Sequence, residues 1–225
     1  MEILKRAKKE KRDKLSEYES KALLGAYGIP VTRETEVADR QQFTDAIREF
    51  GFPLVIKACG PELSHKTERG LVRVDIRNEQ EALTAYEEIM NKIKDDGGTV
   101  LVQEMVVGSR ELVVGLIRDR QFGPCVMFGL GGIFTEILKD ISFRVAPIEK
   151  RDALEMMQEI KARKILDSVR GMPPADLDQL AEILIKVGEI GLTHDDIKEI
   201  DINPVILSGS QPIAVDALVV LNPSG

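Results

Sequence analysis

Short runs of β-branched residues alternate along this chain with segments whose apolar residues recur at helical spacing. The runs FPLVIKAC at 52–59, LVRVDI at 71–76 and ELVVGLIRD at 111–119 have the composition of buried strands. Between them, residues 41–50 and 78–95 show the pattern of amphipathic helices. This alternation predicts an α+β fold.

The pattern also suggests where the chain divides. It is interrupted near Gly97 and Gly98, and the segments that follow are richer in strands. A chain of 225 residues is long enough for two small lobes that share a cleft. We therefore expect an N-terminal lobe over residues 1–98 and a C-terminal lobe over residues 99–225.

Charge and cysteine content narrow the class of protein. A formal net charge of -7 opposes general binding to nucleic acid, because phosphates are neutralised by a basic surface. The basic run at 5–14 could attract RNA or anionic lipid, but its interleaved Glu10 and Asp13 fit a solvated helix better. Two isolated cysteines, no long apolar span and no signal-like segment suit a soluble cytoplasmic protein.

Lys57 and His65 are candidates for phosphate chemistry. Lys57 ends an apolar strand, where an ammonium group is costly to bury unless it meets an anion such as a phosphate. His65 lies in a polar loop beside Lys66, and an imidazole can carry a phosphoryl group that nearby ammonium groups help to hold. The alternatives are a lysine that extends from a strand end into water and an exposed loop histidine.

Three oxygen-bearing side chains recur in the last two apolar segments. Asp201 and Asn203 share one face of a predicted strand, and Asp216 falls on the next strand of a predicted hairpin. Mg²⁺ prefers hard oxygen ligands and keeps waters and substrate phosphates in its shell, so one or two such side chains suffice. The alternative is that these side chains face water.

Glu104 and Glu111 flank a turn, and either could accept hydrogen bonds from the adenine or ribose of a nucleotide. The glycine cluster FGLGG at 128–132 could bring backbone amides to a phosphate, or it could simply form a turn. It lacks the residues of a Walker A loop and the spacing of a dinucleotide-binding fingerprint.

Six segments occur in a characteristic order: FPLVIKA, SHKTERG, QEMVVGSRELVVG, FGPCVMFGLGGIFTEILKDISFRVAPI, VRGMPPAD and EIDINPVIL with AVDAL. Together they resemble the β subunit of ADP-forming acetyl-CoA synthetases, over nearly the whole chain. The resemblance implies an ATP-grasp fold and an enzyme that converts acyl-CoA, ADP and phosphate to acid, CoA and ATP. A separate α subunit would hold CoA and form the acyl phosphate, in an α2β2 assembly.

The resemblance also implies roles for individual residues. His65 matches the family's mobile histidine, which carries the phosphoryl group to the nucleotide. The remaining matches assign Lys57 to the nucleotide phosphates, Glu104, Val106 and Glu111 to the nucleotide's adenosine side, Arg144 to the phosphates, and Asn203 and Asp216 to Mg²⁺.

One position departs from the family pattern. Where relatives have a glycine pair after the histidine loop, this chain has Gly70 followed by Leu71, and we expect the bulkier residue to restrict the loop. Two other functions stay open from the sequence. They are an ATP-grasp ligase that joins a carboxylate to an amine without His65, and a nucleotide-binding regulatory module.

Overall fold

The computed structural model describes residues 1–60, 69–94, 97–132, 140–169 and 171–222. These residues form two compact units. Unit 1 comprises Met1–Leu15, Ser20–Val31 and Val106–Gly225, and unit 2 comprises Ser16–Glu19 and Thr32–Met105. The units therefore interleave near the N-terminus, whereas the lobes expected at 1–98 and 99–225 are contiguous stretches. That these stretches act as the functional lobes stays a prediction.

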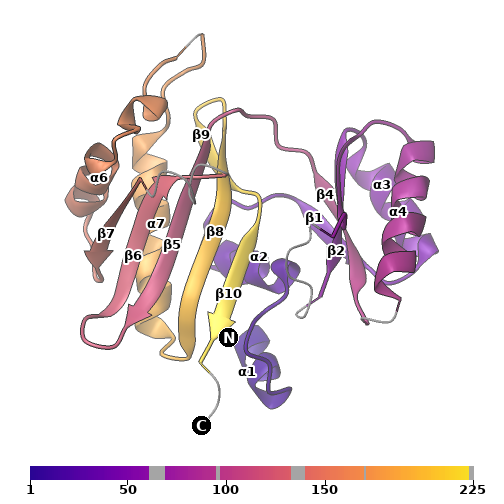
Figure 1. The fold of residues 1–225 in the computed structure, drawn as a ribbon, viewed down its shortest axis with the longest axis horizontal. Coiled ribbons are helices and arrows are strands. Elements are labelled where there is room, and N and C mark those ends of the chain that lie inside the picture. The colour runs from indigo at the N-terminus through magenta and orange to yellow at the C-terminus, as the bar shows by residue number, and fades with distance from the viewer. Residues whose placement is uncertain (61–68, 95–96, 133–139, 170, 223–225) are drawn as a thin grey trace. The chain divides into compact units, whose positions relative to one another are not determined.

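Unit 2 is a four-stranded antiparallel sheet with two helices on one face (Figure 1). Its strand order is β1–β4–β2–β3, with bounds Glu34–Val37, Thr99–Glu104, Leu54–Cys59 and Val72–Ile76. Helices α3 (Arg40–Phe50) and α4 (Glu79–Ile93) begin after Asp39 and Asn78, whose side chains accept backbone N–H bonds as N-caps. The strands and helices predicted for this stretch are confirmed.

The two faces of strand β2 have different surroundings. Leu54, Ile56 and Ala58 belong to the apolar core beneath α3 and α4. Successive side chains of a strand point to opposite faces, so Lys57 and Cys59 lie on the face turned away from these helices. Both are nevertheless buried.

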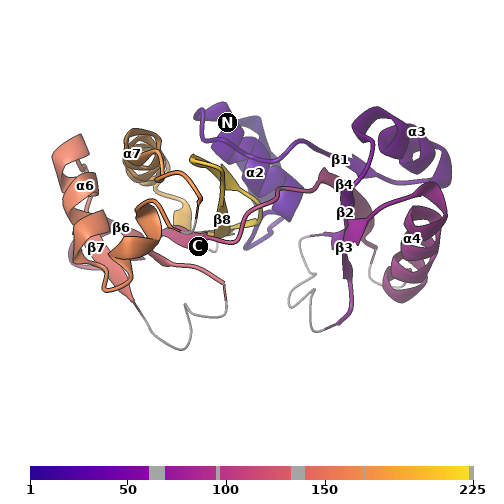
Figure 2. The ribbon, with the colours of Figure 1, turned by 90° about the horizontal axis from the view of Figure 1, so that it is seen from above.

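Unit 1 is built on a six-stranded antiparallel sheet of order β10–β8–β5–β6–β7, with β9 paired to β8. The strands are β5 (Glu111–Asp119), β6 (Gly123–Leu130), β7 (Ile141–Val145), β8 (Ile197–Ser208), β9 (Gln211–Ala214) and β10 (Ala217–Leu221). Helices α6 (Lys150–Glu159) and α7 (Leu177–Thr193) lie along one face of this sheet (Figure 2).

Two further helices precede this sheet in the sequence. Helix α1 (Glu2–Lys9) buries Leu4 and Ala7, so the basic run begins on a helix with one apolar face. Helix α2 (Glu17–Ala26) starts with a capping box: Ser16 Oγ accepts a bond from the Glu19 amide, and the Glu19 carboxylate accepts one from the Ser16 amide. A short 3₁₀ helix, η1 (Arg163–Leu166), follows α6.

Strand register assigns side chains to the two faces of the unit 1 sheet. Ile200, Leu116, Val126 and Arg144 form one row across β8, β5, β6 and β7. The first three belong to the core beneath the helices, so Arg144 shares the helix-covered face. The neighbouring row, which contains Asp201, therefore lies on the opposite face.

The C-terminal hairpin differs from the prediction in one respect. The segment expected as a single strand over residues 213–221 is divided into β9 and β10, and Asp216 lies between them. Both strands pair with β8, at different places along its length. Among the described residues, no helix is long and apolar enough to cross a membrane.

Candidate nucleotide and metal site

The predicted site residues fall into two groups. Lys57 and Glu104 belong to unit 2, whereas Val106, Glu111, Arg144, Asn203 and Asp216 belong to unit 1. His65 lies outside the described residues.

Lys57, within strand β2 rather than at its end, forms a buried ion pair. Its Nζ lies 2.7 Å from Glu17 Oε1, and the two side chains are 6% and 3% exposed. Glu17 is the first residue of α2, so the capping box that starts this helix also places the carboxylate. The Glu17 carboxylate thus supplies the anion that a buried ammonium group requires.

Glu104 closes one end of the unit 2 sheet. Its two carboxylate oxygens accept bonds from the Arg33 backbone N–H and from Arg33 Nε, each at 2.8 Å. The carboxylate is 29% exposed and stays accessible to a further donor. Val106, the first residue of unit 1 after strand β4, is half-buried.

A glycine turn in unit 1 brings two of the candidate residues together. The Gly131 amide donates to the Glu111 carbonyl oxygen at 2.9 Å, and the Gly132 amide donates to Asn203 Oδ1 at 3.1 Å. Gly132 has a φ of +64°, and a Cβ there would lie 2.1 Å from Glu111 Oε2. A Cβ on Gly131 would lie 2.5 Å from the Leu112 carbonyl oxygen. The turn therefore requires glycine at both positions.

Asn203 and Asp216 are neighbours beside this turn. The Asn203 amide donates to the Asp216 carbonyl oxygen at 3.2 Å. Burial, together with nearby Glu199 and Asp216, raises the pKa of the Asp201 carboxyl to about 6. The Asp201 carboxyl thus lies in a buried environment with acidic neighbours.

This donor set fits Mg²⁺ by its chemistry, because every candidate ligand atom is oxygen. Within the described ranges, no three His, Cys, Asp or Glu side chains gather as a metal site. The candidate pair consists of one amide, Asn203, and one carboxylate, Asp216, which leaves room for phosphate oxygens and waters in an octahedral shell.

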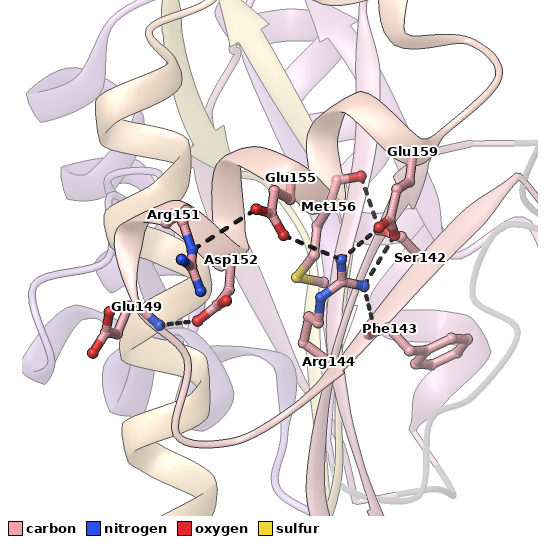
Figure 3. A network of polar contacts seen from close by, with 9 residues as sticks. All are labelled: Ser142, Phe143, Arg144, Glu149, Arg151, Asp152, Glu155, Met156 and Glu159. Atoms are coloured by element: carbon pink, nitrogen blue, oxygen red, sulfur yellow. Dashed lines mark hydrogen bonds and ion pairs between the residues drawn. The ribbon is translucent and has the colours of Figure 1, made fainter.

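Arg144 is held on the other face of the sheet (Figure 3). Its guanidinium pairs with both carboxylate oxygens of Glu159 and lies 3.8 Å from Glu155, and it also donates to the Phe143 carbonyl oxygen. The Glu159 carboxylate raises the pKa of the Arg144 guanidinium further, and Arg144 holds the Glu159 pKa below its usual range. The structure does not bring Arg144 together with Asn203 and Asp216.

Leu71 has a different environment from the one its position suggested. It is 1% exposed and belongs to the unit 2 core, and its carbonyl oxygen accepts a bond from the Ala58 amide. The preceding Gly70 has a φ of +63°, so it supplies the permissive backbone position. Leu71 is thus a core residue of the sheet.

Sequence reasoning missed Glu17 and Arg110. Nothing in the sequence around Glu17 indicates a partner 40 positions away, at Lys57. The buried Arg110 guanidinium donates to the carbonyl oxygens of Ile165, Asp167, Pro173 and Gly209 at 2.6–3.3 Å. It ties η1 and the segment after it to the β8–β9 turn.

Comparison with known proteins agrees with this architecture. The ATP-grasp domain family matches residues 6–221. The β subunit of ADP-forming acetate-CoA ligase I from Pyrococcus furiosus is 47% identical over 98% of this chain and 97% of its own length. The chain belongs to the ATP-grasp β subunits of ADP-forming acetate-CoA ligases. The predicted family and fold are confirmed.

Relatives of this ATP-grasp β subunit include both a longer protein and a chain of similar extent. The ADP-forming acetate-CoA ligase I of Archaeoglobus fulgidus is 41% identical over 88% of this chain, which spans only 30% of that longer protein. An acetyl-CoA synthetase structure from Ca. Korarchaeum cryptofilum has a TM-score of 0.93 at 42% identity, with 98% of this chain and 99% of that chain covered.

A second structure of the Korarchaeum enzyme has a TM-score of 0.87 at 42% identity, with 98% of this chain and 99% of that chain covered. It is described as a complex with coenzyme A and Mg-AMPPCP, with a phosphohistidine segment pointing towards the nucleotide binding site. That enzyme therefore contains both a magnesium nucleotide and a phosphohistidine segment.

Proposed function

We propose that this chain is the nucleotide-handling β subunit of an ADP-forming acyl-CoA synthetase, with acetyl-CoA as the expected thioester. The observation that carries the proposal is the 47% identity to a stand-alone β subunit over almost the full length of both chains. The overall reaction would be acyl-CoA, ADP and phosphate to acid, CoA and ATP, in either direction.

His65 would carry the phosphoryl group. In the direction of ATP synthesis, an oxygen of the terminal ADP phosphate attacks the phosphorus of phosphorylated His65. The P–N bond breaks as the new P–O bond forms, and the released imidazole nitrogen takes up a proton. Such transfers depend mainly on positioning and on neutralising the charge of the moving group.

The remaining residues would hold the nucleotide. Lys57 would contact the phosphates, as the match to the family implies, and its ammonium group would then be shared between the phosphates and Glu17. Glu104, Val106 and Glu111 would line the adenosine side.

Asn203 and Asp216 would hold Mg²⁺, which when bound neutralises phosphate oxygens. The separate phosphate role expected for Arg144 has less support, because Arg144 is paired with two carboxylates of α6.

Partner chemistry follows from the same proposal. A separate α subunit would hold CoA and form the acyl phosphate, and two α and two β chains would assemble. Sedimentation of the chain with a cognate α subunit measures the assembly. A mass that corresponds to one β chain alone in the mixture would contradict it.

Labelling with γ-³²P-ATP tests the phosphoryl relay. The chain is incubated with Mg²⁺ and labelled ATP, with and without the α subunit, and is compared with His65→Asn. We expect acid-labile, base-stable label on the wild type and none on the variant, because phosphohistidine has this stability. ATP binding without label in either mixture would overturn the relay and favour a carboxylate-amine ligase or a regulatory module.

A further inference from the structure

Asn203 has a side-chain orientation that the glycine turn sets. An asparagine amide can present either its oxygen or its NH₂ group toward a neighbouring site, and only the oxygen can bind a metal ion. The Gly132 N–H donates a hydrogen bond to Asn203 Oδ1 at 3.1 Å. This bond orients the Asn203 amide with its oxygen, rather than its NH₂ group, toward the turn. A carbonyl oxygen has two lone pairs, which leaves the second one available.

We propose that Gly132 is a positioning residue for Mg²⁺: its backbone N–H holds Asn203 with Oδ1 toward the metal, and its lack of a side chain makes this contact possible. The inference rests on the proposed function, because it takes Asn203 as a metal ligand. It assigns a role to a residue that otherwise serves only as part of a turn.

The backbone conformation and the neighbouring Glu111 side chain both favour glycine at position 132. The φ of +64° disfavours any residue with a Cβ, and the Cβ of an alanine would lie 2.1 Å from Glu111 Oε2 and 3.3 Å from Glu111 Cδ. Relief of this contact requires a shift of the Glu111 side chain or of the chain at Gly132, and a shift of the chain would move the N–H with it.

The turn has little freedom to absorb such a shift. Cβ atoms built on Gly129 and Gly131 would also meet backbone atoms at 2.5 Å, those of Asp140 and Leu112. Close packing on both sides of β6 therefore fixes the path that the chain takes into Gly132. The register of Leu112 with Leu130 and of Gly129 with Ile141 continues this packing into the neighbouring strands.

Strand β6 offers a matched control at its other end. Gly123 has a φ of +77°, which imposes the same penalty on alanine, but a Cβ there meets nothing within 4 Å. Gly123→Ala therefore reproduces the backbone strain of Gly132→Ala without touching Glu111 or Asn203.

The test measures how strongly Mg²⁺ enhances ADP binding. Isothermal titration gives the Kd of the full chain for ADP in EDTA and in Mg²⁺, and the ratio isolates the metal contribution from any general loss of nucleotide contact. We expect the ratio to fall at least fivefold in Gly132→Ala, to stay within twofold of wild type in Gly123→Ala, and to be abolished in Asn203→Ala.

The outcomes separate this inference from the proposed function. If Asn203→Ala lowers the ratio and Gly132→Ala does not, Gly132 has no positioning role, whereas the metal assignment stands. If Asn203→Ala keeps the wild-type ratio, the metal assignment itself fails.

A measurement on the wild-type backbone covers the case in which Gly132→Ala does not fold. Hydrogen exchange of the Gly132 amide, followed in ¹⁵N-labelled protein, is expected to be slow in the wild type and at least tenfold faster in Asn203→Ala. An unchanged exchange rate would mean that Asn203 does not hold this amide, and the inference would be wrong.

Discussion

The Lys57–Glu17 ion pair permits a quantitative prediction about unit 2. Removing one partner of a buried ion pair typically costs about 3–5 kcal/mol. Because the two side chains are only 6% and 3% exposed, solvent screening reduces this cost little. We expect Glu17→Gln and Lys57→Met each to destabilise unit 2 by roughly 3 kcal/mol.

The double variant Glu17→Gln, Lys57→Met should be much less destabilised than the sum of the single variants. Both charges are then removed, so we expect a coupling energy of about 1.5–3 kcal/mol. Amide hydrogen exchange of strands β2 and β4 is the assay, because it reports the opening of unit 2 by itself. Single-variant costs that add without coupling would refute the reasoning.

The exposed pair Arg73–Glu88 is the control in the same unit. Its atoms are 2.8 Å apart, but its side chains are 34% and 49% exposed. Exposed pairs contribute about 0–1 kcal/mol, so the corresponding cycle should give a small coupling energy. A similar coupling in both cycles would mean that burial does not determine the strength of the Lys57–Glu17 interaction.

Three further predictions concern single side chains. Arg110→Met removes a buried guanidinium that donates to four carbonyl oxygens and should destabilise unit 1 by about 3 kcal/mol, measured by urea unfolding with near-ultraviolet circular dichroism; a loss below 1 kcal/mol would contradict this role of Arg110. Burial raises the pKa of the Cys59 thiol to about 11, so the neutral thiol dominates at pH 8 and Cys59 should react with Ellman's reagent only in urea. Rapid reaction in the folded protein, located by mass spectrometry, would show that the thiol is accessible. Arg144→Met should leave the Kd for ADP within twofold, because the guanidinium is engaged by Glu159; a tenfold loss in titration calorimetry would restore its phosphate role.

Local patterns were sufficient to predict most strands and helices. The β-branched runs act within a few residues, and the strands at 54–59 and 111–119 occur as expected. The exception is the segment 213–221, where Asp216 interrupts the predicted strand. Its apolar composition alone does not show that β8 pairs with two short strands in succession.

Tertiary partners could not be predicted from such patterns. Glu17 and Lys57 are 40 positions apart in the sequence, and only the folded structure brings the carboxylate to 2.7 Å from the ammonium group. Arg144 alternates with Phe143 and Val145 along β7, so Arg144 lies on one face of the strand and the two apolar residues lie on the other. The sequence of β7 does not show which face meets the helices, because this depends on carboxylates of α6. In the structure Arg144 faces α6, and Phe143 and Val145 are exposed.

The pairing of Lys57 with Glu17 also has a kinetic consequence. A lone ammonium group acts as a point charge whose field extends into solvent, whereas opposite charges 2.7 Å apart act as a short dipole whose field fades much faster with distance. Lys57 would therefore contribute to nucleotide retention rather than to long-range attraction. The association rate of the nucleotide should therefore depend almost not at all on Lys57. The contribution of Lys57 to the dissociation rate of the nucleotide should change little with ionic strength.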